Sequence, residues 1–148
     1  MRTLTLIALV ALAGWAEGLV GTWLMDSARS TFTGETRPKR LTARIETHSK
    51  GEVLTLETVA GDGRATTSSS ILYLDAKPRE FQDDTCSGTQ TSRRTDKATV
   101  EVVRNCQDGG WIRLVLRMAA QPNKLTLEIT KQPTVGPHVE WRLSMEKR

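Results

Sequence analysis

The chain has 148 residues, of which 38% are hydrophobic and 26% are charged, and its formal net charge at pH 7 is +4. This length suits one domain with a single core, and the modest apolar content fits a thin-walled barrel better than a thick multilayered core. The basic residues are scattered and are not interleaved with exposed aromatic residues, so a nucleic-acid groove is not expected.

The first sixteen residues predict a signal peptide. Arg2 precedes an apolar run from Leu4 to Ala13, which is about half as long as a membrane-spanning helix must be. Gly14-Trp15-Ala16 places small residues where a signal peptidase cuts, so we expect cleavage after Ala16. The mature domain, residues 17–148, would then be secreted or periplasmic, with no stable membrane anchor and a net charge of +3 once Arg2 is removed. The alternative is a buried N-terminal helix.

Turn residues divide the mature chain into short segments, and from Asp96 onward they recur about every thirteen residues. This spacing is typical of strands joined by short hairpins, and helices would not need such frequent breaks. The breaks are Ser49-Lys50-Gly51, Gly61-Asp62-Gly63, Thr95-Asp96-Lys97, Asp108-Gly109-Gly110, Gln121-Pro122-Asn123 and Pro133 to Pro137.

Between these breaks, hydrophobic and polar side chains alternate as in strands with one buried face. We predict strands at residues 20–26, 41–48, 53–60, 64–74, 86–94, 98–106, 111–119, 124–132 and 138–146, with a loop at 26–39. Consecutive antiparallel strands leave two exposed edges unless the sheet closes. The prediction is therefore an all-β protein, an antiparallel up-and-down meander of eight or nine strands that closes as a lipocalin-like, calycin-type barrel. A two-sheet β-sandwich is the alternative.

The mature chain contains two cysteines, Cys86 and Cys106. In an exported chain an even number of cysteines predicts a disulfide. A three-residue loop at residues 95–97 would pair strand positions whose numbers sum to 192, which places Cys86 directly opposite Cys106. Closing this loop should stabilise the fold by about 3 kcal/mol.

The mature chain opens with Gly21-Thr22-Trp23-Leu24-Met25-Asp26, and Ala28-Arg29-Ser30 and Phe32 follow. Later motifs are Pro38-Lys39, Gly61-Asp62-Gly63-Arg64, Thr99-Val100-Glu101-Val102, Lys124-Leu125-Thr126-Leu127 and the ending Glu146-Lys147. Together they resemble an uncharacterised family of exported, lipocalin-like bacterial proteins that typically open with Gly-Thr-Trp-Lys-Leu-Asn. The cysteine pair departs from the pattern of that family.

The resemblance implies a structural role for Trp23. In lipocalins a Gly-x-Trp tryptophan plugs the closed end of the barrel beneath a basic side chain from late in the chain. Arg142 or Lys147 would be this cation–π partner of Trp23. A plain core tryptophan is the alternative, and neither role provides a reaction.

Groups suited to catalysis are scarce. His48 and His138 are isolated and lack a cysteine or carboxylate at ligand spacing, so no metal site is predicted. Ser68, Ser69 and Ser70 lack the Gly-x-Ser-x-Gly context of a hydrolase, and there is no glycine-rich phosphate loop. We therefore expect a protein without enzymatic activity or cofactor.

The strand after residue 64 is rich in serine and threonine. Thr67, Ser69, Ile71 and Tyr73 share one face, and Thr66, Ser68, Ser70, Leu72 and Leu74 share the other. Small polar side chains that point outward are ordinary strand surface, which we favour slightly, whereas inward ones would line a partly unfilled lumen. The candidate lumen-lining residues are Thr67, Ser69, Ile71, Tyr73 and Trp141.

The function expected from these observations is the binding of a small, partly apolar molecule in the barrel lumen. Two alternatives stay open. One is a secreted protein-interaction module such as a protease inhibitor, and the other is an envelope protein without a dedicated ligand. The sequence does not indicate an oligomeric state.

Overall fold

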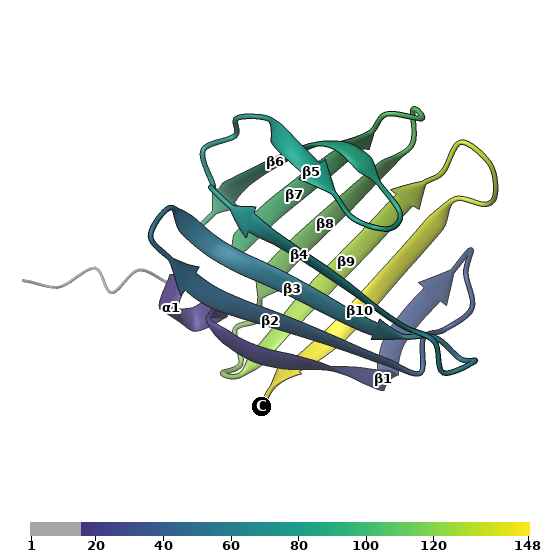
Figure 1. Ribbon diagram of the computed structural model, residues 1–148. Coiled ribbons are helices and arrows are strands. Elements are labelled where there is room, and N and C mark those ends of the chain that lie inside the picture. The colour runs from purple at the N-terminus through teal and green to yellow at the C-terminus, as the bar shows by residue number, and fades with distance from the viewer. Residues whose placement is uncertain (1–15) are drawn as a thin grey trace, which may run out of the picture.

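The computed structural model describes residues 16–148 as one rolled β-sheet preceded by a short helix (Figure 1). The predicted signal peptide lies outside the described residues except for Ala16. Within residues 16–148, no helix is long and apolar enough to cross a membrane. The elements are α1 (Ala16–Leu19), β1 (Gly21–Thr33), β2 (Arg40–His48), β3 (Gly51–Val59), β4 (Ala65–Leu72), β5 (Arg79–Gln82), β6 (Ser87–Asp96), β7 (Thr99–Cys106), β8 (Trp111–Met118), β9 (Lys124–Gln132) and β10 (Val139–Lys147).

The ten strands form one antiparallel sheet in the order β4-β3-β2-β1-β10-β9-β8-β7-β6-β5. Every strand pairs with its neighbour in the chain except that β4 and β5 do not pair, and β1 pairs with β10 instead. The sheet is thus a nearly closed up-and-down barrel, which confirms the predicted fold class. The alternative of a two-sheet sandwich is wrong, because the first and last strands join into the same sheet.

Two strand predictions need correction. β1 continues to Thr33, through residues predicted as a loop, because it bends at a register shift between Asp26 and Thr31 and then pairs with β10 alone. Ser30 stabilises this bend: its hydroxyl donates to the Asp26 carbonyl (2.6 Å) and accepts from the Ser144 amide (3.1 Å). β5 was not predicted, since its four residues include a single buried apolar side chain, Phe81.

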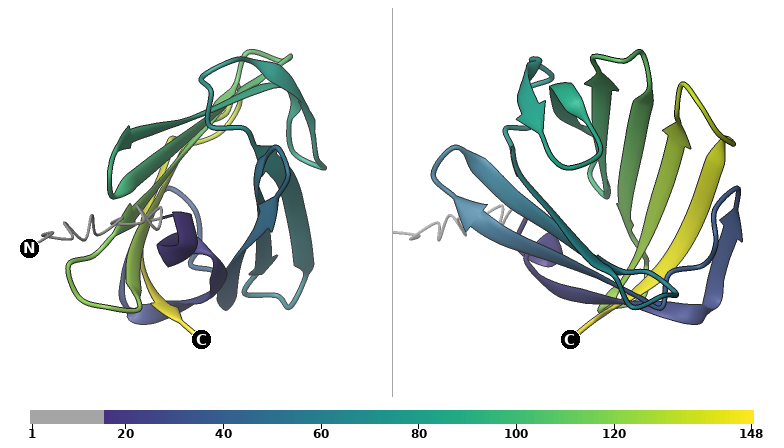
Figure 2. Two further views of the ribbon diagram at one scale, coloured as in Figure 1. Left: turned by 90° about the vertical axis from the view of Figure 1, so that its left-hand side faces the viewer. Right: turned by 45° about the vertical axis from the view of Figure 1, so that its right-hand side comes forward.

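The helix α1 lies across the end of the barrel near the N-terminus (Figure 2), and Leu19 and Trp23 belong to the hydrophobic core at this end. Leu19 and Trp23 are almost fully buried, and the Trp23 indole N–H donates to the Leu19 carbonyl over 2.8 Å. Lys147 pairs with Trp23 across β1 and β10, and its Nζ lies 5.6 Å from the centre of the indole ring. Arg142 lies elsewhere, exposed on the outer face of β10 and 3.9 Å from Glu128.

Cys86 and Cys106 form a disulfide with a Cα–Cα distance of 5.2 Å. The predicted register is wrong by two residues, because Cys106 pairs with Gly88 and Cys86 lies just before β6. A register shift between Arg94 and Asp96 causes the difference. Side chains two residues apart on a strand share a face, so the sulfur atoms still meet.

The gap between β4 and β5 leaves a seam between β4 and β6, which side chains and a few backbone groups bridge. The Leu74 amide donates to Ser92 Oγ (2.9 Å), and the Gln90 side-chain amide donates to the Ile71 carbonyl (3.3 Å). At the same seam, buried Glu52 on β3 lies 3.9 Å from Arg94 on β6. Polar side chains therefore replace the missing strand ladder.

Glu52 gives a pH-dependent prediction. Burial raises the pKa of Glu52, and Arg94 opposes this change. A carboxyl with a higher pKa in the folded state contributes stability that is complete below its unfolded pKa and is lost as pH rises through the folded pKa. We therefore expect Glu52→Gln to be more stable than the wild type at pH 7, with the difference shrinking toward about pH 3.5.

Urea unfolding at both pH values measures this difference. Glu46→Gln, on the exposed face of β2, is the control and should change stability little at either pH. A Glu52→Gln variant that is less stable than the wild type at pH 7 would show that the Arg94 contact outweighs the cost of burying the charge.

Candidate ligand-binding site

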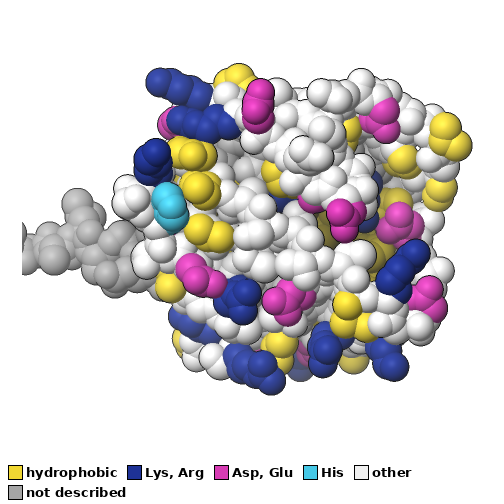
Figure 3. Space-filling model, in the orientation of Figure 1, with side chains coloured by type: hydrophobic (Ala, Val, Ile, Leu, Met, Phe, Trp, Pro, Cys, Tyr) yellow, Lys and Arg dark blue, Asp and Glu magenta, His cyan; other side chains and the backbone are white. Residues whose placement is uncertain are grey.

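The barrel encloses a cavity of about 400 Å³ at the end opposite α1. Its border includes Glu35 from the β1–β2 connection, Arg64 from the β3–β4 turn, and Asp83 and Asp84 after β5. The space-filling view shows a recess with hydrophobic side chains at its base and charged side chains of both signs around it (Figure 3). The cavity is therefore polar at its mouth and hydrophobic at its base.

The floor of the cavity consists of apolar side chains from the inner faces of five strands. They are Leu41 on β2, Leu56 on β3, Ile112 and Leu114 on β8, Ile129 on β9 and Trp141 on β10. These positions alternate with outward polar residues, as in any strand with one buried face. The floor thus continues the hydrophobic core, which fills the barrel toward α1.

Trp141 lies at one side of this floor. Its ring contacts Phe32 edge-on with 5.4 Å between ring centres, and Lys131 Nζ lies 5.4 Å from the centre of the indole ring. The Trp141 indole nitrogen is buried and has no hydrogen-bond partner among residues 16–148. A buried donor without a partner is unfavourable, and because this nitrogen is buried the ring presents its apolar surface to the cavity.

Arg104 on β7 lines the side of the cavity next to the seam between β4 and β6. It is 3% exposed, and its Nε donates to Gln90 Oε1 over 2.9 Å. Its terminal nitrogens reach across the seam to Ser68 Oγ (3.4 Å) and Ser70 Oγ (3.3 Å) on β4. The guanidinium also lies 4.1 Å from the centre of the Phe81 ring. Arg104 therefore connects β4, β5, β6 and β7.

The buried charge of Arg104 lies 4.0 Å from the carboxylate of Asp83. Burial lowers the pKa of Arg104 to about 10, and the Asp83 carboxylate opposes this change. Burial raises the pKa of Asp83, but hydrogen bonds from Thr85, Cys86 and Ser68 outweigh it and hold that pKa below its usual value. Both groups are thus charged at neutral pH.

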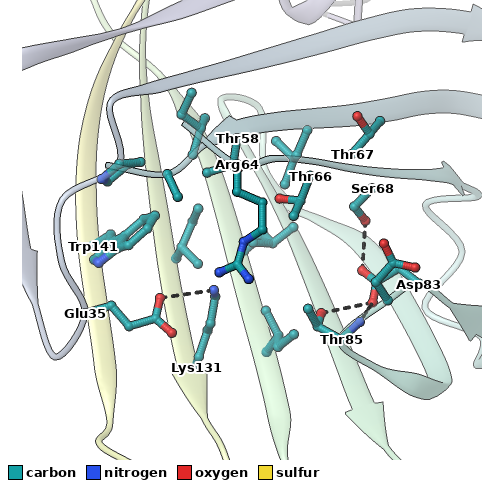
Figure 4. A pocket seen from close by; sticks show the side chains of 18 of the residues that line it. Glu35, Thr58, Arg64, Thr66, Thr67, Ser68, Asp83, Thr85, Lys131 and Trp141 are labelled. Carbon is teal, nitrogen blue, oxygen red and sulfur yellow. Dashed lines mark hydrogen bonds and ion pairs between the residues drawn. The ribbon is translucent and has the colours of Figure 1, made fainter. Parts of the chain in front are cut away.

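Two cations reach the mouth from different parts of the chain, Arg64 from the β3–β4 turn and Lys131 from β9. Figure 4 shows the Arg64 guanidinium and the Lys131 ammonium pointing into the same part of the pocket. Lys131 Nζ lies 3.5 Å from Glu35 Oε2. The Arg64 guanidinium has no hydrogen-bond or ion-pair partner in the part of the chain that the structure describes, where its backbone amide donates to Asp62 and its carbonyl accepts from the Ala60 amide. Arg64 is therefore available to a ligand.

The inner face of β4 carries the even-numbered side chains, whereas the residues predicted to line the lumen are odd-numbered. Ser70 and Ser68 pair with the buried Leu54 and Leu56 of β3, so the even-numbered side chains point inward. Ser69 instead accepts or donates a hydrogen bond with Thr55 on the outer face (3.1 Å). Of the five residues proposed to line the lumen, Thr67 and Trp141 border the cavity. Ser69, Ile71 and Tyr73 border a separate depression of about 220 Å³ between β4 and β5.

The other residues considered for chemistry are dispersed. His48 accepts a hydrogen bond from the Lys50 amide in the β2–β3 turn, and His138 contacts Gln132 and Glu140. Across residues 16–148, no group of three or more His, Cys, Asp or Glu residues is arranged to hold a metal ion. Sequence reasoning did not identify Arg64, Lys131 or Arg104 as cavity residues. The alternation of β7 could have indicated Arg104, because it follows Val100 and Val102 at an inward position of the strand.

No protein-family model and no curated protein sequence matches this chain. Among solved structures, it is similar to a zebrafish ileal bile acid-binding protein that was crystallised with cholic acid. The TM-score is 0.52 at 11% sequence identity, over 88% of this chain and 99% of the zebrafish chain. A likeness at this identity concerns the fold alone. The chain therefore has the calycin-type fold, a nearly closed barrel of ten antiparallel strands.

Proposed function

We propose that this protein is an exported, non-enzymatic binding protein that holds one small, partly apolar molecule in its barrel. The observation that carries the proposal is the cavity of about 400 Å³ with an apolar floor and a polar mouth. Protein interiors are otherwise packed nearly without voids, and small-molecule sites are concave, mostly apolar and edged by a few polar groups. The cavity matches that description.

The arrangement of the barrel supports a dedicated site. The end with α1 is filled by Leu19, Trp23 and the surrounding core, whereas the inner faces at the opposite end leave space beside Leu56, Leu114 and Ile129. The zebrafish protein of similar fold was crystallised with a small molecule, cholic acid. This likeness supports small-ligand binding here without identifying the ligand.

Two features support export. The chain begins with the pattern of a signal peptide, and it carries a disulfide between Cys86 and Cys106. Disulfides persist in oxidising compartments such as the periplasm and the extracellular space. Both features support the proposal that the protein is secreted or periplasmic.

The first test uses the neutral fluorophore N-phenyl-1-naphthylamine. We expect saturable one-to-one binding with increased, blue-shifted emission, because the dye moves from water to an apolar cavity. Thr58→Trp adds a large side chain to the cavity wall and should weaken binding by about tenfold or more. Glu57→Trp, at an exposed position on the opposite face of β3, is the matched control and should bind as the wild type does.

Two results would contradict the proposal. One is the absence of saturable binding to the wild type. The other is unchanged binding to Thr58→Trp, which would mean that the dye occupies a different surface.

A further inference from the structure

Two positive side chains meet at the mouth of the cavity although they come from separate parts of the sheet. Arg64 immediately precedes β4, and Lys131 lies near the end of β9. Figure 4 shows both charged groups pointing into the same part of the pocket. Like charges repel at short range, so a negative group between them would stabilise this arrangement.

The acidic side chains of the described chain do not fully supply this negative group. Glu35 contacts Lys131 at 3.5 Å, but the Glu35 side chain is 47% exposed and can be hydrated instead. Asp83 is already bonded to Ser68, Thr85 and the Cys86 amide. Asp84 is exposed on the border. Arg64 has no partner among these acids, and a ligand anion would provide one.

Exposure along the cavity defines the orientation of such a ligand. Arg64 is exposed and Lys131 is partly exposed, whereas Leu41 and Leu114 on the floor are each 1% exposed. An anionic group at the mouth would keep contact with water on one side. The apolar part of the molecule would then cover the floor and the face of Trp141, where it would replace water.

We infer, on the basis of the proposed function, that the ligand is an amphiphile with one anionic group bound between Arg64 and Lys131 and an apolar body directed into the barrel. Arg64 and Lys131 therefore determine which class of ligand the cavity selects. The apolar floor contributes affinity that does not depend on the charge of the ligand.

Isothermal titration calorimetry with three ten-carbon probes at pH 7.5, below their micellar concentrations, tests this inference. The probes are decanoate, decan-1-ol and decyltrimethylammonium. We expect decanoate to bind about tenfold more tightly than decan-1-ol, because charge-assisted hydrogen bonds add to the same apolar contact. The cationic probe should bind more weakly than the alcohol.

Variants separate the anion site from the apolar floor. The double variant Arg64→Gln, Lys131→Gln should lose the preference for decanoate and keep its affinity for decan-1-ol. Lys50→Gln, an exposed change in the β2–β3 turn at the opposite end, is the matched control and should keep the preference. Glu35→Gln should strengthen decanoate binding, since it removes a competitor for Lys131.

The outcomes distinguish this inference from the proposed function. Decan-1-ol binding as tightly as decanoate, or a preference that survives in the double variant, would overturn the inference and leave a cavity that binds neutral ligands. Binding of none of the three probes, together with no binding of N-phenyl-1-naphthylamine, would overturn both.

Discussion

Replacing Arg104 by methionine is expected to lower the free energy of unfolding by about 3 kcal/mol. Methionine keeps much of the length of the side chain but removes every hydrogen bond that the guanidinium makes across the seam. Gln90 would lose its partner at 2.9 Å, and Asp83 would lose the nearby positive charge. Ser68 and Ser70 would no longer be connected to β7. Urea unfolding followed by tryptophan fluorescence measures the change.

Arg142→Met is the matched control for this experiment. Its side chain is 69% exposed on the outer face of β10, and the loss of such a surface ion pair should cost less than about 0.5 kcal/mol. Buried charges are costly to desolvate, and some are replaced by apolar residues without loss. An Arg104→Met variant as stable as the wild type would therefore show that the seam does not depend on Arg104.

Removing the disulfide should have an effect of similar size. The bond joins residues 20 positions apart, and opening a loop of this length in the unfolded chain costs about 3 kcal/mol. The double variant Cys86→Ala, Cys106→Ala is expected to lose that amount in a urea titration. The wild type in dithiothreitol should reach the same free energy of unfolding.

The double variant is its own control for the reductant, because dithiothreitol should not change its stability. If the wild type had the same free energy of unfolding with and without dithiothreitol, this expectation would be contradicted. It would mean that the contacts around Asp83 and Cys86 hold the segment before β6 without the covalent bond.

The fold could be predicted from the sequence because each long strand alternates hydrophobic and polar side chains and ends at a turn. The failures occurred where this pattern is interrupted. β1 passes through polar residues at its bend, and Ser30 supplies hydrogen bonds there that no hydrophobic pattern indicates. β5 has only four residues, so its alternation is too short to recognise.

The register of β6 and β7 could not be predicted for a similar reason. The expected three-residue loop at residues 95–97 is replaced by a strand that continues to Asp96 with a register shift. Because the error was an even number of residues, both cysteines stayed on the same face. The disulfide prediction was therefore confirmed, although the assumed pairing was wrong.

The candidate site was harder to predict than the fold. Which face of β4 points inward depends on its pairing with Leu54 and Leu56 of β3, and both faces carry small polar residues. Arg64 and Lys131 are ordinary basic residues in the sequence, and only the rolled sheet brings them together. Trp141 was identified because it belongs to a strand with a clear apolar face.

The central claim is that one small molecule binds in the cavity beside Trp141 and away from Trp23. The most direct measurement is a two-dimensional ¹H–¹⁵N NMR titration with N-phenyl-1-naphthylamine, in which the indole signals of Trp23, Trp111 and Trp141 are assigned by single Trp→Phe variants. We expect the Trp141 signal to shift saturably, while Trp23 at the closed end and Trp111 on the outer face stay in place. An unchanged Trp141 signal at saturating dye, or equal shifts of all three signals, would contradict the claim.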